Sequence, residues 1–376
     1  MRSILNHIRC RIVDLNSQNL TGVGTAETPE ANDRDLSLDF TKGVLIVLVI
    51  VGHLIQYIIY RDDGFWCSPY FKWIYMFHMP LFMAISGYLS CRALLQKSLA
   101  CAVWDRALQL LLPMLFWCAV LETVKLAAFP SPHDATGFSL ALLYDVVGTY
   151  WFVWAAFICF LFVKLLLIFD RSLPLLLLLS VVAVELTPLT ISIVPLIKYT
   201  YPFFCLGFAF SQSRAHWTRM RGGYKLLLIA FVYIAACASF LVWHRDTYVY
   251  NNLALVRDLI SAKSVLLMLF GSAAASAIMS EFLSRCWRLG RSTRVFRFIA
   301  IDIGQSTLLL YLIQGTVFRL MDSIQYAEPP DLATGLAVGA ILGGTLVLFA
   351  LLVRKMISEN PFLSQLLLGA SPRIFR

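Results

Sequence analysis

The feature that most constrains the fold is the stretch LDFTKGVLIVLVIVGHLIQYIIY, which runs from Leu38 to Tyr60. About 20 consecutive, mostly apolar residues are what an α-helix needs to cross the hydrocarbon core of a bilayer. Comparable stretches predict ten spans, at 43–60, 71–91, 107–128, 149–169, 173–194, 196–212, 224–243, 263–283, 299–319 and 332–353. Nothing alternates with the period of a membrane β-strand. The sequence therefore predicts an all-α polytopic membrane bundle of about ten transmembrane helices.

Composition supports this class. Of the 376 residues 59% are hydrophobic and only 14% are charged, which excludes an ordinary soluble multidomain protein. We expect a polar N-terminal tail at 1–36, a transmembrane domain at 37–356 and a C-terminal tail at 357–376, with no appended soluble domain. The nine cysteines are scattered singly, so neither a metal site nor a disulfide framework is indicated.

The basic residues predict the orientation. Most of the 31 Lys and Arg residues share one side of the membrane if the amino terminus is cytoplasmic, and cytoplasmic loops are the ones enriched in Lys and Arg. Both termini are therefore predicted to be cytoplasmic. This topology and attraction to anionic headgroups account for the net charge of +9, so the expected partner is the lipid bilayer and not nucleic acid.

Two histidines lie deep within the first two predicted spans. His53 is seven residues below the outer end of the first span, and His78 is seven residues below the outer end of the second, which runs back inward. At 1.5 Å per residue both imidazoles lie about 10 Å below the outer surface. Each could simply hydrogen-bond a neighbouring helix, but an ionisable group at membrane depth is a candidate functional residue. We therefore predict that the two histidines belong to one site.

Three basic residues gather at the inner ends of the first three spans. Lys42 precedes His53 by eleven positions, so the two project from nearly the same helical face, about 16 Å apart along the axis. Arg92 follows the second span and Arg106 opens the third. Each alone could be an ordinary anchor at the membrane surface. Together they would suit the phosphates of an anionic ligand with a long flexible arm.

Several of these stretches are similar to signatures of a known family. In LDFTKGVLIVLVIVGH a basic residue and a histidine are separated by ten positions, and FHMPLFMAISGYL is built on His, Pro and Ser-Gly. Weaker similarities follow in order through DRALQLLLPMLFW, YWFVWAAFICF, YPFFCLGFAF and IGQSTLLLYLIQ. The chain resembles, over almost its whole length, the acyltransferase 3 family of integral membrane acyltransferases. Within that family it most resembles fucose O-acetylase-like members and xanthan-type exopolysaccharide O-acetyltransferases.

The resemblance implies a multi-pass protein of the bacterial inner membrane with ten helices. It implies acetyl-CoA as co-substrate with no bound cofactor or metal. The acceptor would be a sugar hydroxyl on an exopolysaccharide or on its lipid-linked oligosaccharide precursor. The match carries Lys42 and His53 onto the first motif, His78 onto the second, and Arg106 onto the arginine before the proline of helix three. Two positions depart from the family pattern. Lys42 stands where Arg is commoner, and a lysine cannot bind a phosphate through two parallel hydrogen bonds as an arginine does. Gln314 stands where the late signature often ends in His, so no catalytic base is assigned to that position.

Acetyl transfer from a thioester to an alcohol needs a base for the hydroxyl proton, and His53 is the residue we predict for it. The developing oxyanion also needs hydrogen-bond donors. Candidate donors are His78, Ser86 near an expected helix break at Gly87, Tyr150 and Trp151. An acetyl-histidine intermediate and direct attack in a ternary complex are both compatible with these residues.

A histidine base usually has an orienting partner. Glu122 and Glu185 are the two carboxylates that the topology places in the outer halves of spans, so either could hold His53. The alternative for each is an ion pair with a nearby lysine such as Lys125, or a water pocket, and the sequence does not choose between them.

The rival function is a proton-coupled transporter or a lipid-linked sugar flippase. Prolines at 80, 188, 195 and 202 could break helices around a central site, but no internal repeat is visible and the polar motifs concentrate in spans one to three. Binding of acetyl-CoA would separate an enzyme from a transporter. The outer loops at 61–72 and 244–258 carry aromatic and acidic residues suited to contact with a sugar.

Overall fold

The computed structural model describes residues 35–60, 63–128, 135–169, 172–219, 222–248, 255–256, 258–324 and 329–369, and every regular element in these residues is helical. The α-helices are, in chain order, α2 (Leu36–Leu54), α3 (Pro69–Gln96), α4 (Leu99–Ala128), α5 (Ala135–Gly148), α6 (Trp151–Leu166), α7 (Leu173–Leu186), α8 (Val194–Arg219), α9 (Gly222–Val242), α10 (Leu259–Gly290), α11 (Arg294–Phe298), α12 (Thr307–Met321), α13 (Leu332–Ile357) and α14 (Pro361–Leu368). Short π-helical segments occupy Ile55–Ile59 and Ile299–Ile303, and 3₁₀ turns occupy Asp63–Cys67, Arg245–Thr247 and Gly304–Ser306.

Six helical segments in the described part of the chain are long and apolar enough to cross a bilayer: Leu36–Ile59, Pro69–Gln96, Leu99–Ala128, Leu259–Gly290, Arg294–Met321 and Leu332–Ile357. The bent pair Leu142–Gly148 and Trp151–Leu166, at 65°, would make a seventh, and Leu173–Leu186 and Leu226–Val242 are shorter apolar helices. Every one of the ten expected spans coincides with a helix, so the all-α membrane bundle is confirmed. The number of about ten crossings and the cytoplasmic termini stay predictions.

The expected span at 173–194 is too long. Helix α7 ends at Leu186, and Thr187 is extended with φ −64° and ψ 123°. Proline disfavours the helical conformation of the residue before it, so Pro188 fixes this end. The predicted tail at 1–36 lies outside the described residues up to position 34, and the predicted tail at 357–376 contains helix α14 before the described residues end at 369.

Aspartate caps begin three of the helices. Asp35 accepts hydrogen bonds from the first amides of α2. Asp258 accepts from the Ser261 amide of α10 at 2.7 Å, and Asp331 accepts from the Thr334 amide of α13 at 2.7 Å. A side-chain oxygen at this position satisfies an amide that has no partner within its own helix. These three boundaries are therefore fixed by local sequence.

Helices α3 and α8 form the most extensive helix–helix contact in the molecule. Their backbones touch at two glycines. A side chain on Gly87 would overlap the carbonyl oxygen of Phe204, and one on Gly207 would overlap the carbonyl oxygen of Ala84. Small residues at helix crossings are what allow such close approach in membrane proteins. The expected break at Gly87 is wrong: α3 runs unbroken through this position, because the glycine serves the crossing and not a bend.

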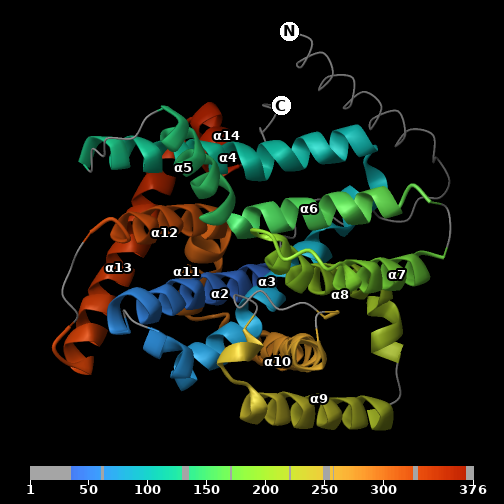
Figure 1. Ribbon diagram of the computed structural model, residues 1–376. Helices are drawn as coiled ribbons and strands as arrows, with labels where there is room; N and C mark the ends of the chain where they lie inside the picture. The colour runs from blue at the N-terminus through green and yellow to red at the C-terminus, as the bar shows by residue number, and fades with distance from the viewer. Residues whose placement is uncertain are drawn as a thin grey trace.

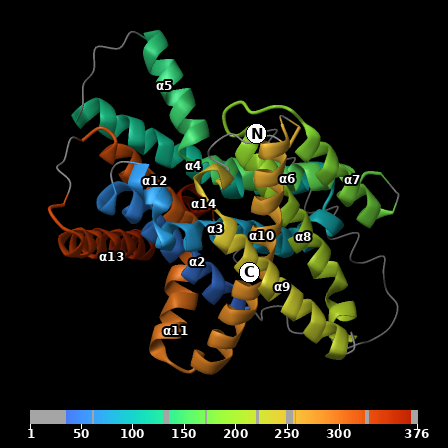
Figure 2. The same ribbon diagram turned by 60° about the horizontal axis from the view of Figure 1, so that its bottom comes forward.

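Helix α2 lies inside the bundle and contacts α3, α10, α12 and α13 (Figure 1). Gly43 faces the Ile299 backbone closely and Gly304 faces the Asp39 carbonyl, which locks α2 against the π-helical segment at Ile299–Ile303. Helix α5 stands at the margin of the bundle beside α4 (Figure 2). The first span is thus a central element whose position is fixed on all sides.

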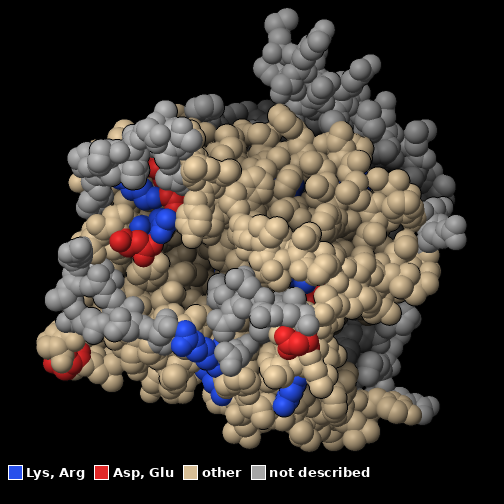
Figure 3. All heavy atoms as spheres, viewed as in Figure 1, with Lys and Arg blue, Asp and Glu red and all other residues tan. Residues whose placement is uncertain are grey.

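Apolar side chains dominate the surface. On the face of Figure 3 charged side chains form a few separate groups in a wide uncharged expanse. Helix α9, for example, exposes several large apolar side chains: Leu226, Leu227, Phe231, Ile234 and Leu241. An apolar surface of this extent is unfavourable in water and is the surface expected to face lipid.

One cysteine departs from expectation, because Cys101 is disulfide-bonded, whereas the seven other cysteines in the described residues are free.

Candidate active site

His53 and His78 line the same cavity, which has a volume of about 410 Å³. His53 comes from the last turn of α2, and His78 comes from α3, the next helix along the chain. The walls are strongly aromatic and include Tyr57, Phe65, Trp66, Phe71, Tyr144 and Tyr311. Phe65 and Trp66 belong to the described part of the loop at 61–72 that we expected to contact a sugar, while 61–62, like 249–254 and 257 of the other loop, lie outside the described residues. The two histidines that we predicted to belong to one site thus line one cavity.

The hydrogen bonding of His78 fixes its tautomer. Its Nδ1 lies 2.8 Å from the carbonyl oxygen of Ile74, one turn earlier in α3. A carbonyl oxygen can only accept, so Nδ1 carries the proton and Nε2 keeps a lone pair. The ring is 2% exposed and packs edge-on against Tyr75, with centroids 4.6 Å apart. His78 is therefore held as a proton acceptor at Nε2.

His53 is held by stacking. Its ring lies on Phe318 with centroids 5.2 Å apart and an interplanar angle of 30°. Its Nδ1 is buried and has no hydrogen-bond partner in the described part of the molecule. A buried polar atom without a partner is costly unless a ligand or water satisfies it. His53 thus presents an unsatisfied ring nitrogen in the cavity wall.

Gln314 supplies a further unsatisfied polar atom to this cavity. Its Nε2 donates to the Tyr311 carbonyl at 3.3 Å, whereas its buried Oε1 has no partner among the described residues. An amide does not titrate, so Gln314 can orient a bound hydroxyl but cannot act as a base. The position we left without a base therefore still faces the site.

The candidate oxyanion donors are dispersed. Trp151 lines the cavity, but the Tyr150 hydroxyl is paired with Thr316 Oγ1 at 2.7 Å and Ser86 Oγ accepts a hydrogen bond from Arg106 at 3.1 Å. His78 uses its Nδ1 proton on Ile74, which leaves its neutral ring no donor for an oxyanion. Of the four predicted donors, Trp151 is the one whose position in the wall suits that role without a change of partner.

Neither predicted carboxylate lines this cavity. Glu122 is paired with Lys125 at 3.3 Å, the alternative that the sequence left open. Glu185 is buried on α7, with Oε1 unpartnered in the described residues, beside helix α8. The carbonyl of Ile74, and not a carboxylate, orients a histidine in this site.

The three basic residues expected to hold phosphates lie outside the cavity wall. Lys42 is paired with the buried Asp39 at 2.7 Å, Arg92 donates to Gln96 at 2.9 Å, and Arg106 donates to Ser86 and to Gln109. The charge of Lys42 is therefore already compensated, while Arg106 retains a buried Nε with no partner among the described residues.

A charged network borders the cavity, and of its ion pairs the sequence had raised only Glu122 with Lys125. Arg319 and Asp322 line the cavity and are joined at 2.8 Å. Arg319 also reaches the buried Asp145 at 2.7 Å, and Asp145 pairs with Lys125, which connects to Glu122. The residues come from α4, α5 and the end of α12, so no local sequence pattern could have grouped them.

Comparison with known proteins supplies the chemistry. A family model described as an acyltransferase domain, of the acyltransferase 3 type, matches residues 35–354. The chain belongs to this acyltransferase family. Two relatives are each named nodulation protein NolL: one from Mesorhizobium japonicum, 51% identical over 91% of this chain and 92% of its own length, and one from Sinorhizobium fredii, 50% identical over 92% and 95%. No solved structure matches the chain.

The cavity with two histidines therefore belongs to a membrane acyltransferase. Within the described residues no cluster of three or more His, Cys, Asp or Glu side chains could hold a metal ion. What the site offers is a fixed proton acceptor, unsatisfied polar atoms and aromatic walls, which are the elements that acyl transfer to a hydroxyl requires.

Proposed function

We propose that the protein is an O-acetyltransferase of the bacterial inner membrane. It moves the acetyl group of cytoplasmic acetyl-CoA to a sugar hydroxyl of an exopolysaccharide or of a lipid-linked oligosaccharide precursor. The observation that carries the proposal is the shared cavity of His53 and His78, with His78 held as a proton acceptor, in a chain that belongs to an acyltransferase family.

The cavity residues can perform direct transfer. The acceptor hydroxyl attacks the thioester carbonyl carbon and gives its proton to Nε2 of His78. The carbonyl electron pair moves to oxygen, and when it returns the carbon–sulfur bond breaks and the CoA thiolate takes the proton back from His78. Because Nδ1 of His78 donates to Ile74, the imidazolium formed in the middle of the reaction is stabilised and oriented. We reassign the base from His53 to His78 on this ground.

His53 then serves as the second polar group of the same site. Its unpartnered Nδ1 and Oε1 of Gln314 would hydrogen-bond the acceptor sugar, and the aromatic walls would pack on its ring. Arg92 and Arg106 with Lys42 remain our candidates for the CoA phosphates. Lys42 would have to exchange its partner Asp39 for a phosphate.

The printed names of the relatives support a more specific acceptor. Both are named nodulation proteins, so we propose that the glycan modified by this chain is one used in nodulation. A lipid-linked oligosaccharide and a finished polysaccharide are both candidate acceptors, because a cavity of about 410 Å³ needs to enclose only the sugar that is modified.

The test is the acetyl content of the host's surface glycans and lipid-linked oligosaccharides. A deletion strain is complemented with the wild-type protein, His78→Gln, His53→Gln or the exposed control Arg285→Gln on α10, with membrane levels of each protein compared by immunoblot. We expect acetylation in the wild-type and Arg285→Gln strains and its loss in the two cavity variants, with glycan export maintained. Full acetylation without the protein, or accumulation of unexported lipid-linked precursor, would overturn the proposal and favour a flippase.

A further inference from the structure

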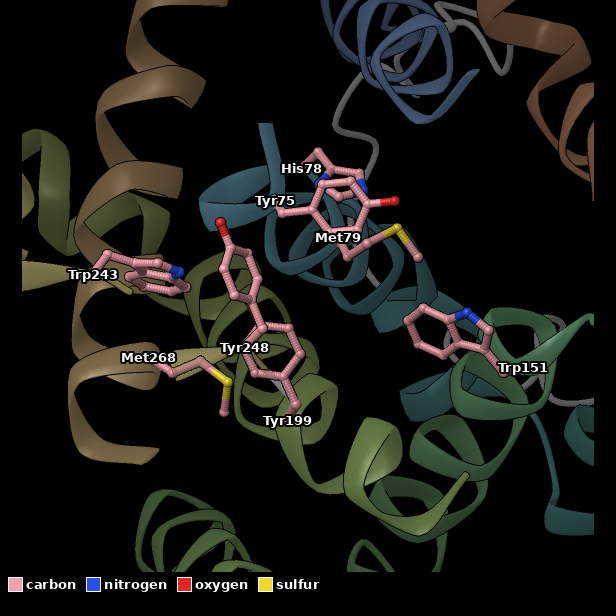
Figure 4. A pocket seen from close by; sticks show the side chains of 8 residues that line it. All are labelled: Tyr75, His78, Met79, Trp151, Tyr199, Trp243, Tyr248 and Met268. Atoms are coloured by element: carbon pink, nitrogen blue, oxygen red, sulfur yellow. The ribbon is translucent and has the colours of Figure 1, made fainter. Parts of the chain in front are cut away.

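A second, smaller pocket adjoins the cavity beside His78. It has a volume of about 10 Å³ and shares Tyr75, His78, Met79 and Trp151 with the larger cavity. Figure 4 shows Tyr75, His78 and Met79 at one side of this pocket, and Trp243 and Trp151 on opposite sides of it. The pocket is therefore a recess of the candidate active site.

Two buried hydrogen-bond donors in this recess have no partner in the part of the chain that the structure describes. Trp243 is 4% exposed and Tyr248 is 3% exposed, and neither Nε1 of Trp243 nor the hydroxyl of Tyr248 makes a hydrogen bond within the described residues. The two rings lie edge to face, with centroids 5.9 Å apart. They come from the end of α9 and the turn that follows it, far along the chain from His78.

Both groups are donors in the resting protein. An indole N–H can only donate. Burial raises the pKa of the Tyr248 phenol more than the neighbouring Trp243 N–H lowers it, so the Tyr248 hydroxyl keeps its proton. By contrast, the Tyr199 hydroxyl in the same recess is bound to Ser272 at 2.9 Å. The recess therefore offers two donors that have no partner among the described residues, and His78 lines the same recess.

The size of the recess selects its occupant. A volume of about 10 Å³ corresponds to about one water-sized probe. A sugar ring does not fit, and a methyl group would leave both donors unsatisfied. One oxygen atom that can accept two hydrogen bonds fits both the size and the chemistry.

We propose that Trp243 and Tyr248 are the oxyanion donors of this acyltransferase, and that the recess receives the carbonyl oxygen of the acyl group. The proposal rests on the proposed function. The acceptor oxygen bonds to the carbonyl carbon as its proton passes to Nε2 of His78, and the carbonyl electron pair moves to the oxygen in the recess. There it accepts from the indole N–H and the phenol O–H. The pair then re-forms the carbonyl, the carbon–sulfur bond breaks, and the thiolate leaves with the proton from His78.

Trp243 and Tyr248 should affect the rate of acyl transfer and not the affinity for acetyl-CoA. A thioester carbonyl is a weak acceptor, and it becomes a strong one only when it carries the developing charge. Donors fixed in a buried recess are already oriented when that charge appears. The rest of the thioester and the acceptor occupy the larger cavity. That cavity adjoins the recess at the four residues that line both, Tyr75, His78, Met79 and Trp151.

The experiment removes the donors and keeps the rings. Tyr248→Phe and Trp243→Phe are measured with radiolabelled acetyl-CoA and lipid-linked oligosaccharides extracted from host membranes, using purified protein in detergent. We expect kcat to fall about a hundredfold or more for each variant, with KM for acetyl-CoA within about twofold of the wild-type value. The pH dependence of kcat should keep the wild-type midpoint, because His78 is unchanged.

Two matched controls separate this role from packing. Tyr201→Phe removes a buried phenol that is bound to Ser180 outside the recess, and Trp117→Phe removes a buried, unpartnered indole N–H on α4 that lines neither pocket. Both should retain wild-type kcat. If Trp243→Phe does not fold, Tyr248→Phe alone decides, since it removes a single oxygen atom.

The outcomes distinguish the two proposals. A wild-type protein that transfers no acetyl group overturns the proposed function. An active wild-type protein whose Tyr248→Phe variant keeps its kcat overturns the oxyanion assignment and leaves the proposed function standing. A variant that loses affinity for acetyl-CoA while keeping kcat also overturns it, since the hydroxyl would then bind the ground state.

Discussion

Substituting Gly207 by alanine should destabilise the protein by forcing apart its most extensive helix pair. The added methyl group would overlap the carbonyl oxygen of Ala84 on α3. A backbone carbonyl in a helix cannot rotate away as the end of a side chain can, so α8 must move as a unit. The substitution therefore acts on the whole α3–α8 crossing.

The magnitude follows from two opposing terms. Overpacking a tight site costs about 1–3 kcal/mol, and the backbone position of the overlapped atom places Gly207→Ala at the upper end. Alanine in place of glycine within a helix gains about 1 kcal/mol. The net expected loss is about 2 kcal/mol. The matched control is Gly344→Ala on α13, where nothing lies within 4 Å of the added methyl, so that only the gain remains.

Thermal unfolding in detergent micelles measures the difference. After the exposed Cys67 and Cys237 have been blocked in the native protein, a thiol-reactive fluorophore reports unfolding, because Cys159 and Cys205 are buried. Gly207→Ala should melt well below the wild type, and Gly344→Ala at or above it. Equal melting temperatures for the two variants would refute the reasoning that α3 and α8 touch through their backbones.

Two further predictions concern charged residues. Asp145→Asn should destabilise the protein by about 2–3 kcal/mol. This is below the full cost of breaking a buried ion pair, because Lys125 and Arg319 each keep a second partner. The same fluorophore assay checks the prediction, and an unchanged melting temperature would contradict it. Hydrogen bonds from Thr334 lower the pKa of Asp331 at the start of α13, so its stabilising effect is present above the unfolded-state pKa, about 3.9, and is lost as the pH falls below it. Melting temperatures of wild type and Asp331→Asn, compared between pH 7 and pH 3, should converge at the acidic end, and a constant difference would exclude this origin.

The sequence alone grouped His53 with His78, and both residues line the cavity. His53 and His78 could be placed at equal depth because consecutive spans run in opposite directions and helical rise converts residue count into distance. The same arithmetic cannot give rotation about the helix axis or hydrogen-bond partners. The division of roles between the two rings therefore depended on the contact of His78 with Ile74, which the structure supplied.

The periphery of the site could not be predicted. Trp243 and Tyr248 reach the recess only because α9 packs on α10 and α10 packs on α3, and no local pattern marks an indole as unpartnered. Glu122 was a candidate partner for His53 because the sequence gives the depth of a residue in the membrane but not its contacts. Its neighbour Asp145 comes from α5, a helix absent from the predicted spans, and the resulting ion pairs became visible only in three dimensions.

The π-helical segment Ile55–Ile59 directly follows His53. A π turn accommodates one residue more than the α turn it interrupts, so the segment behaves as a single inserted residue. Deleting one residue within it should restore a regular α-helix without turning His53 away from the cavity, because the register of α2 before the deletion is unchanged. A relative with a regular first span would align to this chain with a one-residue gap just after the histidine. The spacing between His53 and the loop that follows can thus change by one residue without moving His53 itself.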